Sequence, residues 1–114
     1  MPRRLRAAEL AALPPGALVR VDLEGTPVAL CRIGESVYAI GGTCPHRGGS
    51  LGHGRLSGSR LACPLHGWMF DVRSGRCLFP PRGTDVRAFP VTIEEGAVYV
   101  ELPDDAAVHT PPQP

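Results

Sequence analysis

The sequence has no lysine, no strong excess of either charge and no long hydrophobic run. All twelve basic residues are arginine, they are spread along the chain, and the formal net charge is only +1. Such a balance provides no basic field that would favour nucleic acid. The apolar stretch at residues 10–13 is too short for a secretory signal or a membrane helix. We therefore expect a protein that binds neither nucleic acid nor a membrane and that stays in the cytoplasm.

Length and composition predict one small globular domain. The chain has 114 residues, of which 43% are hydrophobic and 20% charged, as in ordinary soluble proteins. At this size a bound metal centre contributes noticeably to stability. We expect a peripheral N-terminal segment at residues 1–16, a folded domain at 17–103 and a disordered tail at 104–114, because the tail is polar and rich in proline.

The hydrophobic pattern predicts an all-β fold. Short apolar or alternating segments recur every eight to twelve residues and are separated by glycine-containing turns, which favours an antiparallel sandwich or barrel. A short helical turn is expected at 7–10, closed by Pro14-Pro15-Gly16. The expected strands lie at residues 17–21, 28–33, 36–40, a pair within 56–63, 68–71, 76–78, and a last hairpin of 86–93 with 97–102 around Glu94-Glu95-Gly96.

Two short loops contain the residues most suited to chemistry. They are Cys44-Pro45-His46-Arg47-Gly48-Gly49 and Cys63-Pro64-Leu65-His66-Gly67-Trp68. Each loop provides one thiol and one imidazole, and a proline stiffens each loop directly after its cysteine. Sixteen residues separate His46 from Cys63, enough for a returning hairpin to bring the loops together. The two loops therefore predict a shared metal centre.

The order of these ligands favours a binuclear iron–sulfur centre. Zinc fingers of the common type group their two cysteines and their two histidines, whereas here the two residue types alternate. A centre with two thiolates on one iron and two imidazoles on the other accepts this order, because each loop supplies one ligand to each iron. A structural zinc site and a Cys44–Cys63 disulfide are the alternatives. Neither explains why a histidine follows each Cys-Pro.

The pattern of Cys-x-His, then sixteen residues, then Cys-x-x-His resembles the Rieske [2Fe-2S] motif. The similarity runs from about Val19 to Leu102 and includes Gly67, Phe70, Asp71 and Gly75 after the second loop. The resemblance implies a Rieske-like sandwich with a two-loop cluster-binding subdomain and a proline loop at 79–83. It also implies that Cys44 and Cys63 hold the inner iron of one [2Fe-2S] cluster, and that His46 and His66 hold the solvent-facing iron.

Two departures from high-potential Rieske proteins predict a low reduction potential. Those proteins join an extra cysteine in each loop by a disulfide, but the matching places here are Gly49 and Leu65. They also place a serine and a tyrosine that donate hydrogen bonds to the cluster, where this chain has Trp68 and Phe70. Reduction takes a neutral cluster to −1, and fewer donors stabilise that charge less. We expect a potential near the bottom of the range of roughly −150 to +300 mV.

The resemblance implies a one-electron carrier rather than an enzyme. Rieske ferredoxins of ring-hydroxylating dioxygenase systems take electrons from a flavin-dependent ferredoxin reductase and pass them to a terminal oxygenase. We expect a monomer that docks weakly and briefly through a patch including Arg47, Leu65 and Pro81. The alternatives are the Rieske-like small subunit of an assimilatory nitrite reductase and a structural zinc-binding module.

The remaining cysteines, histidines and aromatic residues are expected to have ordinary roles. Cys31 and Cys77 are interpreted as packed thiols rather than ligands. His53 is expected on a loop surface, with a partner contact or a proton-linked role as the alternative. Trp68 and Phe70 are expected to be core or cluster-shielding groups rather than electron relays.

Overall fold

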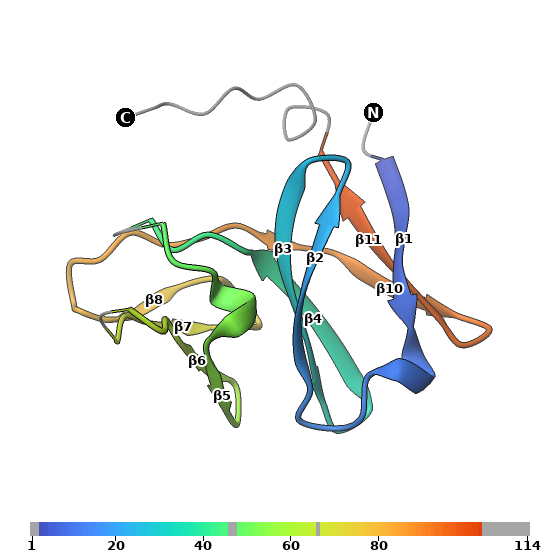
Figure 1. The fold of residues 1–114 in the computed structure, drawn as a ribbon, viewed down its shortest axis with the longest axis horizontal. Helices are drawn as coiled ribbons and strands as arrows, with labels where there is room; N and C mark the ends of the chain where they lie inside the picture. Colours follow the sequence, from blue (N-terminus) through green and yellow to red (C-terminus); the bar gives the residue numbers. More distant parts are fainter. Residues whose placement is uncertain (1–2, 46–47, 66, 104–114) are drawn as a thin grey trace.

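The computed structural model describes residues 3–45, 48–65 and 67–103, and these residues form three antiparallel sheets (Figure 1). The first sheet has the order β1 (Arg3–Glu9), β11 (Ala97–Leu102) and β10 (Val91–Glu94). The second has the order β2 (Leu18–Leu23), β3 (Thr26–Ile33), β4 (Ser36–Gly41) and β9 (Ala88–Phe89). The third has the order β5 (Arg55–Ser57), β6 (Arg60–Ala62), β7 (Met69–Asp71) and β8 (Cys77–Phe79).

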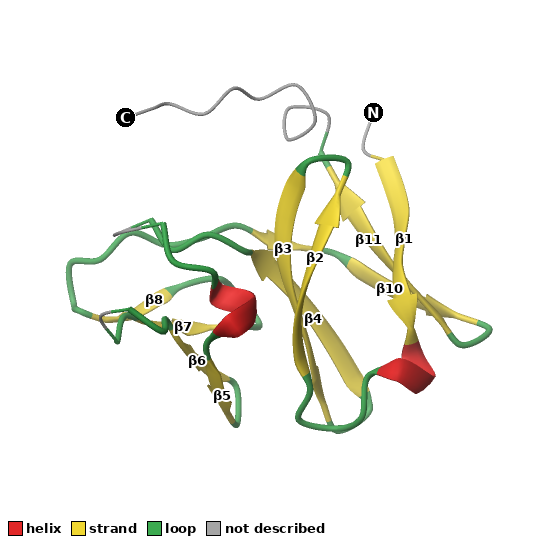
Figure 2. Ribbon diagram, in the orientation of Figure 1, coloured by secondary structure: helices red, strands yellow, loops and turns green. Residues whose placement is uncertain are grey.

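The only helices among the described residues are two short 3₁₀ turns, η1 (Leu10–Ala12) and η2 (Leu51–His53) (Figure 2). The predicted all-β, antiparallel fold class is therefore confirmed. No described helix has the length and apolar character needed to cross a membrane.

The turn residues fix the register of two hairpins. Glu24 and Gly25 join β2 to β3 with φ values of 52° and 86°, and Glu95 and Gly96 join β10 to β11 with 50° and 80°. Positive φ at both positions is the two-residue turn that suits the twist of an antiparallel hairpin. Leu23 therefore pairs with Thr26, and Glu94 pairs with Ala97.

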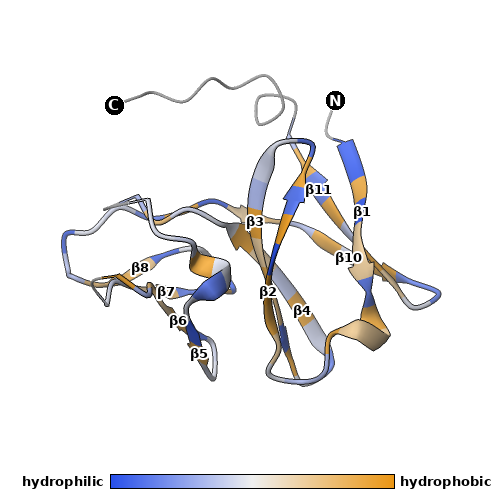
Figure 3. Cartoon of the chain, viewed as in Figure 1, coloured by the Kyte–Doolittle hydropathy of each residue, from blue (hydrophilic) through white to orange (hydrophobic). Residues whose placement is uncertain are grey.

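Strand β3 belongs to two hydrophobic cores at once. Val28 and Leu30 face a body core with residues of β2, β4 and β11, whereas Ala29 and Cys31 face a second core with residues of β6 and β7 and with both cysteines of the expected metal site. Hydrophobic residues accordingly recur along the strands of the molecule (Figure 3). Because alternate side chains point to opposite faces, one strand positions the body against the cluster-binding subdomain.

The helical turn predicted near the N-terminus is wrong for Ala7–Glu9. These residues belong to β1, which pairs with β11 from Arg3 opposite Leu102 to Glu9 opposite Ala97, with an irregularity between Arg6 and Ala8. The helical character is confined to η1, after which Leu13 is buried in the body core. Pairing with a strand about ninety residues away overrides the local helix preference of alanine and glutamate. The N-terminal segment is therefore an integral strand rather than a peripheral one.

The single strand predicted at 86–93 is divided in two. Its first part is β9, which pairs with β4, and its second part is β10, which pairs with β11. Pro90 lies between them and has no N–H to donate to a ladder, while its carbonyl accepts a 3.0 Å hydrogen bond from the N–H of Glu101. The chain consequently changes sheets at this proline.

Gly75 allows the chain to approach Val86 closely, and we expect Gly75→Ala to destabilise the protein by about 3 kcal/mol. Its φ is +81°, and an added Cβ would lie 2.1 Å from the carbonyl oxygen of Val86. Gly58→Ala is the matched control, because Gly58 has φ +59° with nothing within 4 Å of an added Cβ. The control should lose only about 1 kcal/mol from backbone strain. Urea unfolding measures both, and equal losses would contradict the close-approach argument.

Candidate metal centre

The two ligand loops are closed by the same hydrogen bonds. In the first, the N–H of Cys44 donates to the carbonyl of Gly49 over 2.8 Å, and Gly48 N–H donates to Cys44 C=O over 2.8 Å. In the second, Cys63 N–H donates to Trp68 C=O over 2.7 Å, and Gly67 N–H donates to Cys63 C=O over 3.3 Å. The fifth residue of each loop is a glycine with positive φ, 74° at Gly48 and 77° at Gly67. The repeated Cys-Pro and glycine positions therefore close the two loops in the same way.

The structure brings the two loops together. A Cβ added at Gly49 would lie 3.0 Å from Cys63 Sγ and 3.1 Å from the side chain of Leu65. Both loops lie at the end of the molecule that carries β5–β8, away from β1 and β10 (Figure 1). Gly49 and Leu65 are the two places where high-potential Rieske proteins carry their disulfide, and here they are adjacent without sulfur.

The two loop cysteines are deeply buried. Cys44 is 1% exposed and Cys63 is 5% exposed, and all four cysteines of the chain are thiols without disulfides. The predicted alternative of a Cys44–Cys63 disulfide is therefore absent from the described residues. These two buried sulfurs are the inner half of the expected ligand set.

The other two predicted ligands, His46 and His66, lie outside the described residues, as does Arg47. Within the described ranges, no three metal-ligating side chains gather, which agrees with an expected set that has only two members there. The sequence still places one histidine two residues after Cys44 and the other three residues after Cys63.

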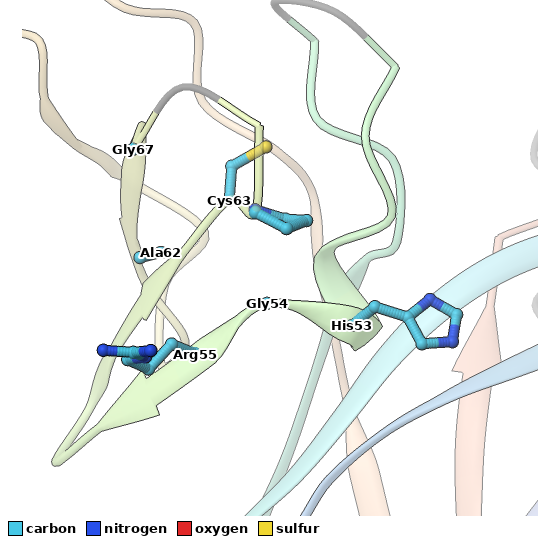
Figure 4. A pocket seen from close by; sticks show the side chains of 7 residues that line it. His53, Gly54, Arg55, Ala62, Cys63 and Gly67 are labelled. Carbon is cyan, nitrogen blue, oxygen red and sulfur yellow. The ribbon is translucent and has the colours of Figure 1, made fainter.

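A pocket of about 480 Å³ lies beside the second loop (Figure 4). It is lined by Cys63, Pro64 and Gly67 of the loop, by Ala62, and by His53, Gly54 and Arg55 of the segment that leads into β5. His53 is exposed at the end of η2, and its Nδ1 lies 2.8 Å from the Ser50 hydroxyl. The predicted surface position of His53 is confirmed.

Comparison with known proteins decides the family of this centre. The family model of the Rieske [2Fe-2S] domain matches residues 4–90. The chain belongs to this family.

Relatives of the Rieske chain cover most of its length. The ferredoxin component of the naphthalene 1,2-dioxygenase system of Pseudomonas aeruginosa is 34% identical over 84% of this chain and 92% of its own. The ferredoxin in a solved complex of reduced oxygenase and oxidised ferredoxin in carbazole 1,9a-dioxygenase is 36% identical, covers 85% of this chain and 91% of that chain, and has a TM-score of 0.80. A putative NADH-dependent nitrite reductase small subunit from Mycobacterium tuberculosis is 29% identical, covers 89% and 96%, and has a TM-score of 0.80.

Family membership implies a [2Fe-2S] cluster, and the described residues fit one. Two thiols are buried in loops that close in the same way, which suits the thiolate-bound iron, and Gly49 lets the backbone of the first loop approach Cys63 Sγ closely, since an added Cβ would lie 3.0 Å from that sulfur. The predicted cofactor is therefore supported by chemistry in the chain itself as well as by the family.

Sequence reasoning missed the packing that holds the proline loop against the second ligand loop. A Cβ added at Gly83 would lie 2.3 Å from Cys77 Sγ and 3.0 Å from the Trp68 ring. Cys77 N–H also donates to Asp85 Oδ1 over 2.7 Å. A glycine directly after Pro-Pro-Arg was the available signal. Cys77 is thus a packed thiol, as predicted, but one that supports a loop next to the site.

The two aromatic residues at and just after the end of the second loop pack as expected. Phe70 is fully buried in the second core, and Trp68 is half-buried with its ring centroid 6.4 Å from that of Phe70. Phe70 is therefore a core residue, and Trp68 covers the adjoining proline loop.

Cys31 should lower the free energy of unfolding at alkaline pH. Burial raises the pKa of its thiol from the ordinary 9.0 to about 11, and a hydrogen bond with the backbone of Tyr38 opposes the shift. Since the folded pKa is the higher one, this contribution is complete below pH 9 and is lost as the pH rises towards 11. We expect Cys31 to account for a loss of about 2 kcal/mol across that window.

The measurement is urea unfolding of the natural protein and of Cys31→Ala at pH 8 and pH 10.5. The stability advantage of the natural protein should fall by about 2 kcal/mol at the higher pH, which is enough to reverse its sign. An advantage that stays constant between the two pH values would show that the thiol does not titrate as described.

Proposed function

We propose that this Rieske protein is a one-electron carrier of the cytoplasm that takes electrons from a flavin-dependent ferredoxin reductase and delivers them to a terminal oxygenase. The main support is the pair of matching loops over two buried thiols, in a chain that covers 92% of a dioxygenase ferredoxin component. A related ferredoxin has been solved in complex with its oxygenase. The cluster supplies the reversible one-electron chemistry.

We assign Cys44 and Cys63 to one iron and His46 and His66 to the other. The burial of both cysteines supports a thiolate-bound iron beneath the surface. One loop supplies one ligand to each iron in this assignment. The imidazoles then form the shortest route between the cluster and a docked partner.

Exposed apolar side chains near the loops support brief protein docking. Leu65 in the second loop is 55% exposed and Phe79 at the start of the proline loop is 54% exposed, while Pro81 beside it is also exposed. A few apolar contacts suit a small transient interface. The chain acts as a monomer in this proposal, and Leu65 and Pro81 belong to its docking patch.

A nitrite reductase small subunit is the second candidate, because a solved structure of that description shares the fold at a TM-score of 0.80. That function requires a stable association with one large catalytic subunit, whereas a ferredoxin must release each partner quickly. Affinity purification from the native host at low salt separates the two. Stoichiometric recovery of a large haem subunit would favour the reductase.

Electron paramagnetic resonance of the dithionite-reduced protein, with a potential titration on the same sample, tests the carrier function. We expect a Rieske-type signal and a midpoint near −150 mV, the lower end of the family range. The reduced protein should also transfer electrons to a purified terminal oxygenase. A colourless protein without iron or labile sulfide after anaerobic reconstitution would refute the proposal and favour the structural zinc alternative.

A further inference from the structure

Acidic residues are almost absent from the part of the chain that surrounds the cluster site. Residues 36–84, which we call the acid-poor segment, contain six arginines and only one acidic residue, Asp71, for a formal charge of +5. The rest of the chain contains six arginines and ten acidic residues, for a formal charge of −4, and the two parts give the total of +1. The charge of the nearly neutral protein is therefore unevenly distributed along its sequence.

Ion pairs increase this uneven distribution. Outside the acid-poor segment, four arginines form ion pairs with neighbouring acidic side chains: Arg3 with Glu24, Arg4 with Glu94, Arg6 with Glu9, and Arg20 with Asp22. Inside it, only Arg73 has a partner among the described residues, Asp71 at 3.4 Å. The other described arginines of the segment are exposed and form no ion pair there: Arg55, Arg60, Arg76 and Arg82. Their charge remains available to a partner.

Arg55 is the arginine that the structure places beside the second ligand loop. It begins β5, pairs across the sheet with Ala62, and lines the same 480 Å³ pocket as Cys63 (Figure 4). Ala62 directly precedes Cys63 in the sequence. Arg55 therefore lies opposite the residue next to the proposed ligand Cys63. A carboxylate entering this pocket would meet an exposed guanidinium, which suits it geometrically and electrostatically.

We infer that the cluster end of the acid-poor segment docks a redox partner whose own docking surface is acidic, with the exposed guanidinium of Arg55 beside the second ligand loop as a principal contact. The inference rests on the proposed function, because it concerns the protein that exchanges electrons with this cluster. A local field of one sign steers the partner towards the cluster end and raises the association rate. A formal charge of only +1 gives no general affinity for polyanions, which separates this role from nucleic-acid binding.

Two small oxidants of opposite charge measure this field directly. The dithionite-reduced holoprotein is mixed in a stopped-flow instrument with ferricyanide, a trivalent anion, or with hexaammineruthenium(III), a trivalent cation. Raising the salt from about 10 mM to 0.5 M should slow the reaction with the anion and accelerate the reaction with the cation. The ratio of the two rate constants cancels any change in the potential or exposure of the cluster.

Arg55→Gln should lower the ferricyanide rate about threefold at 10 mM salt, with little effect at 0.5 M. Arg55→Lys should keep the natural rate. Arg6→Gln is the matched control, because it removes the same charge from β1, far from β5–β8 (Figure 1). Two cytochromes serve as protein-sized probes. The rate of electron transfer to an acidic cytochrome b5 should fall with salt, as with ferricyanide. The rate to a basic cytochrome c should rise with salt, as with hexaammineruthenium(III).

Equal effects of Arg55→Gln and Arg6→Gln, or a ferricyanide rate that rises with salt, would overturn the inference. Retention of the natural protein on a duplex oligonucleotide column at 150 mM salt would also overturn it by assigning the charge to a polyanion. These failures differ from failure of the carrier function. In that case, the reduced protein would give no Rieske signal and no oxidation would be recorded with either reagent.

Discussion

Cys63→Ala is expected to abolish the cluster. Cys63 is 5% exposed at the start of the second loop, where alanine provides no sulfur. Loss of a thiolate ligand leaves one iron with incomplete coordination, so both irons should be released. Iron and acid-labile sulfide should fall from about two of each per chain to near zero, with loss of the visible absorption and of the Rieske signal.

The control for this variant is Cys31→Ala. Cys31 is another buried thiol of the same core, but the sequence pattern and its place on β3 exclude it from the ligand loops. This control should retain iron and sulfide and lose only some stability, about 1 kcal/mol. Equal iron loss in both variants would show that damage to the core, rather than loss of a ligand, explains the result.

His66→Cys is expected to lower the midpoint potential by about 100 mV or more and to reduce cluster occupancy. A third thiolate adds negative charge, so an incoming electron meets a cluster that is already anionic. Centres with four thiolates lie near about −400 mV, well below Rieske centres. Potential titration followed by electron paramagnetic resonance measures the shift on the fraction that retains its cluster.

His53→Cys provides the same substitution at an imidazole outside the ligand pattern. His53 is exposed at the end of η2 and interacts with the Ser50 hydroxyl. Its replacement should leave the potential within about 20 mV, because an exposed side chain is screened from the cluster by water. An unchanged midpoint in His66→Cys would contradict the ligand assignment.

The hairpins and the family were predictable because their determinants are local. Glu24-Gly25 and Glu95-Gly96 specify turns with positive φ at both positions, and the strands beside them pair in the register that these turns impose. The closure of the two loops that carry the proposed cysteine ligands is equally local, since each Cys-Pro begins a six-residue loop whose ends are hydrogen-bonded.

The errors arose where distant residues decide the structure. The alanine-rich segment in β1 becomes a strand only because β11 supplies a partner. Pro90 divides the predicted strand at 86–93, because its first half pairs with β4 and its second half pairs with β11. The close packing of Gly83 on Cys77 and Trp68 likewise depends on tertiary contact.

The uneven distribution of the acidic residues was overlooked for a different reason. The arginines are indeed spread along the chain, but the acidic residues are not, and their absence from residues 36–84 creates a local excess of positive charge. Counting one sign alone hides such a division. The ion pairs in the folded body then show which arginines are already satisfied.

The placement of β3 between two cores has a consequence for the rate of electron exchange. A one-residue shift of β3 would turn Val28 and Leu30 towards the second core and Ala29 and Cys31 towards the body core. Both cores therefore oppose such a shift of the strand. Strand β4 is hydrogen-bonded to β3 and ends three residues before Cys44. Cys44, the proposed first thiolate ligand, is thereby anchored to a framework that resists displacement, and adding or removing one electron should require little reorganisation of the surrounding protein.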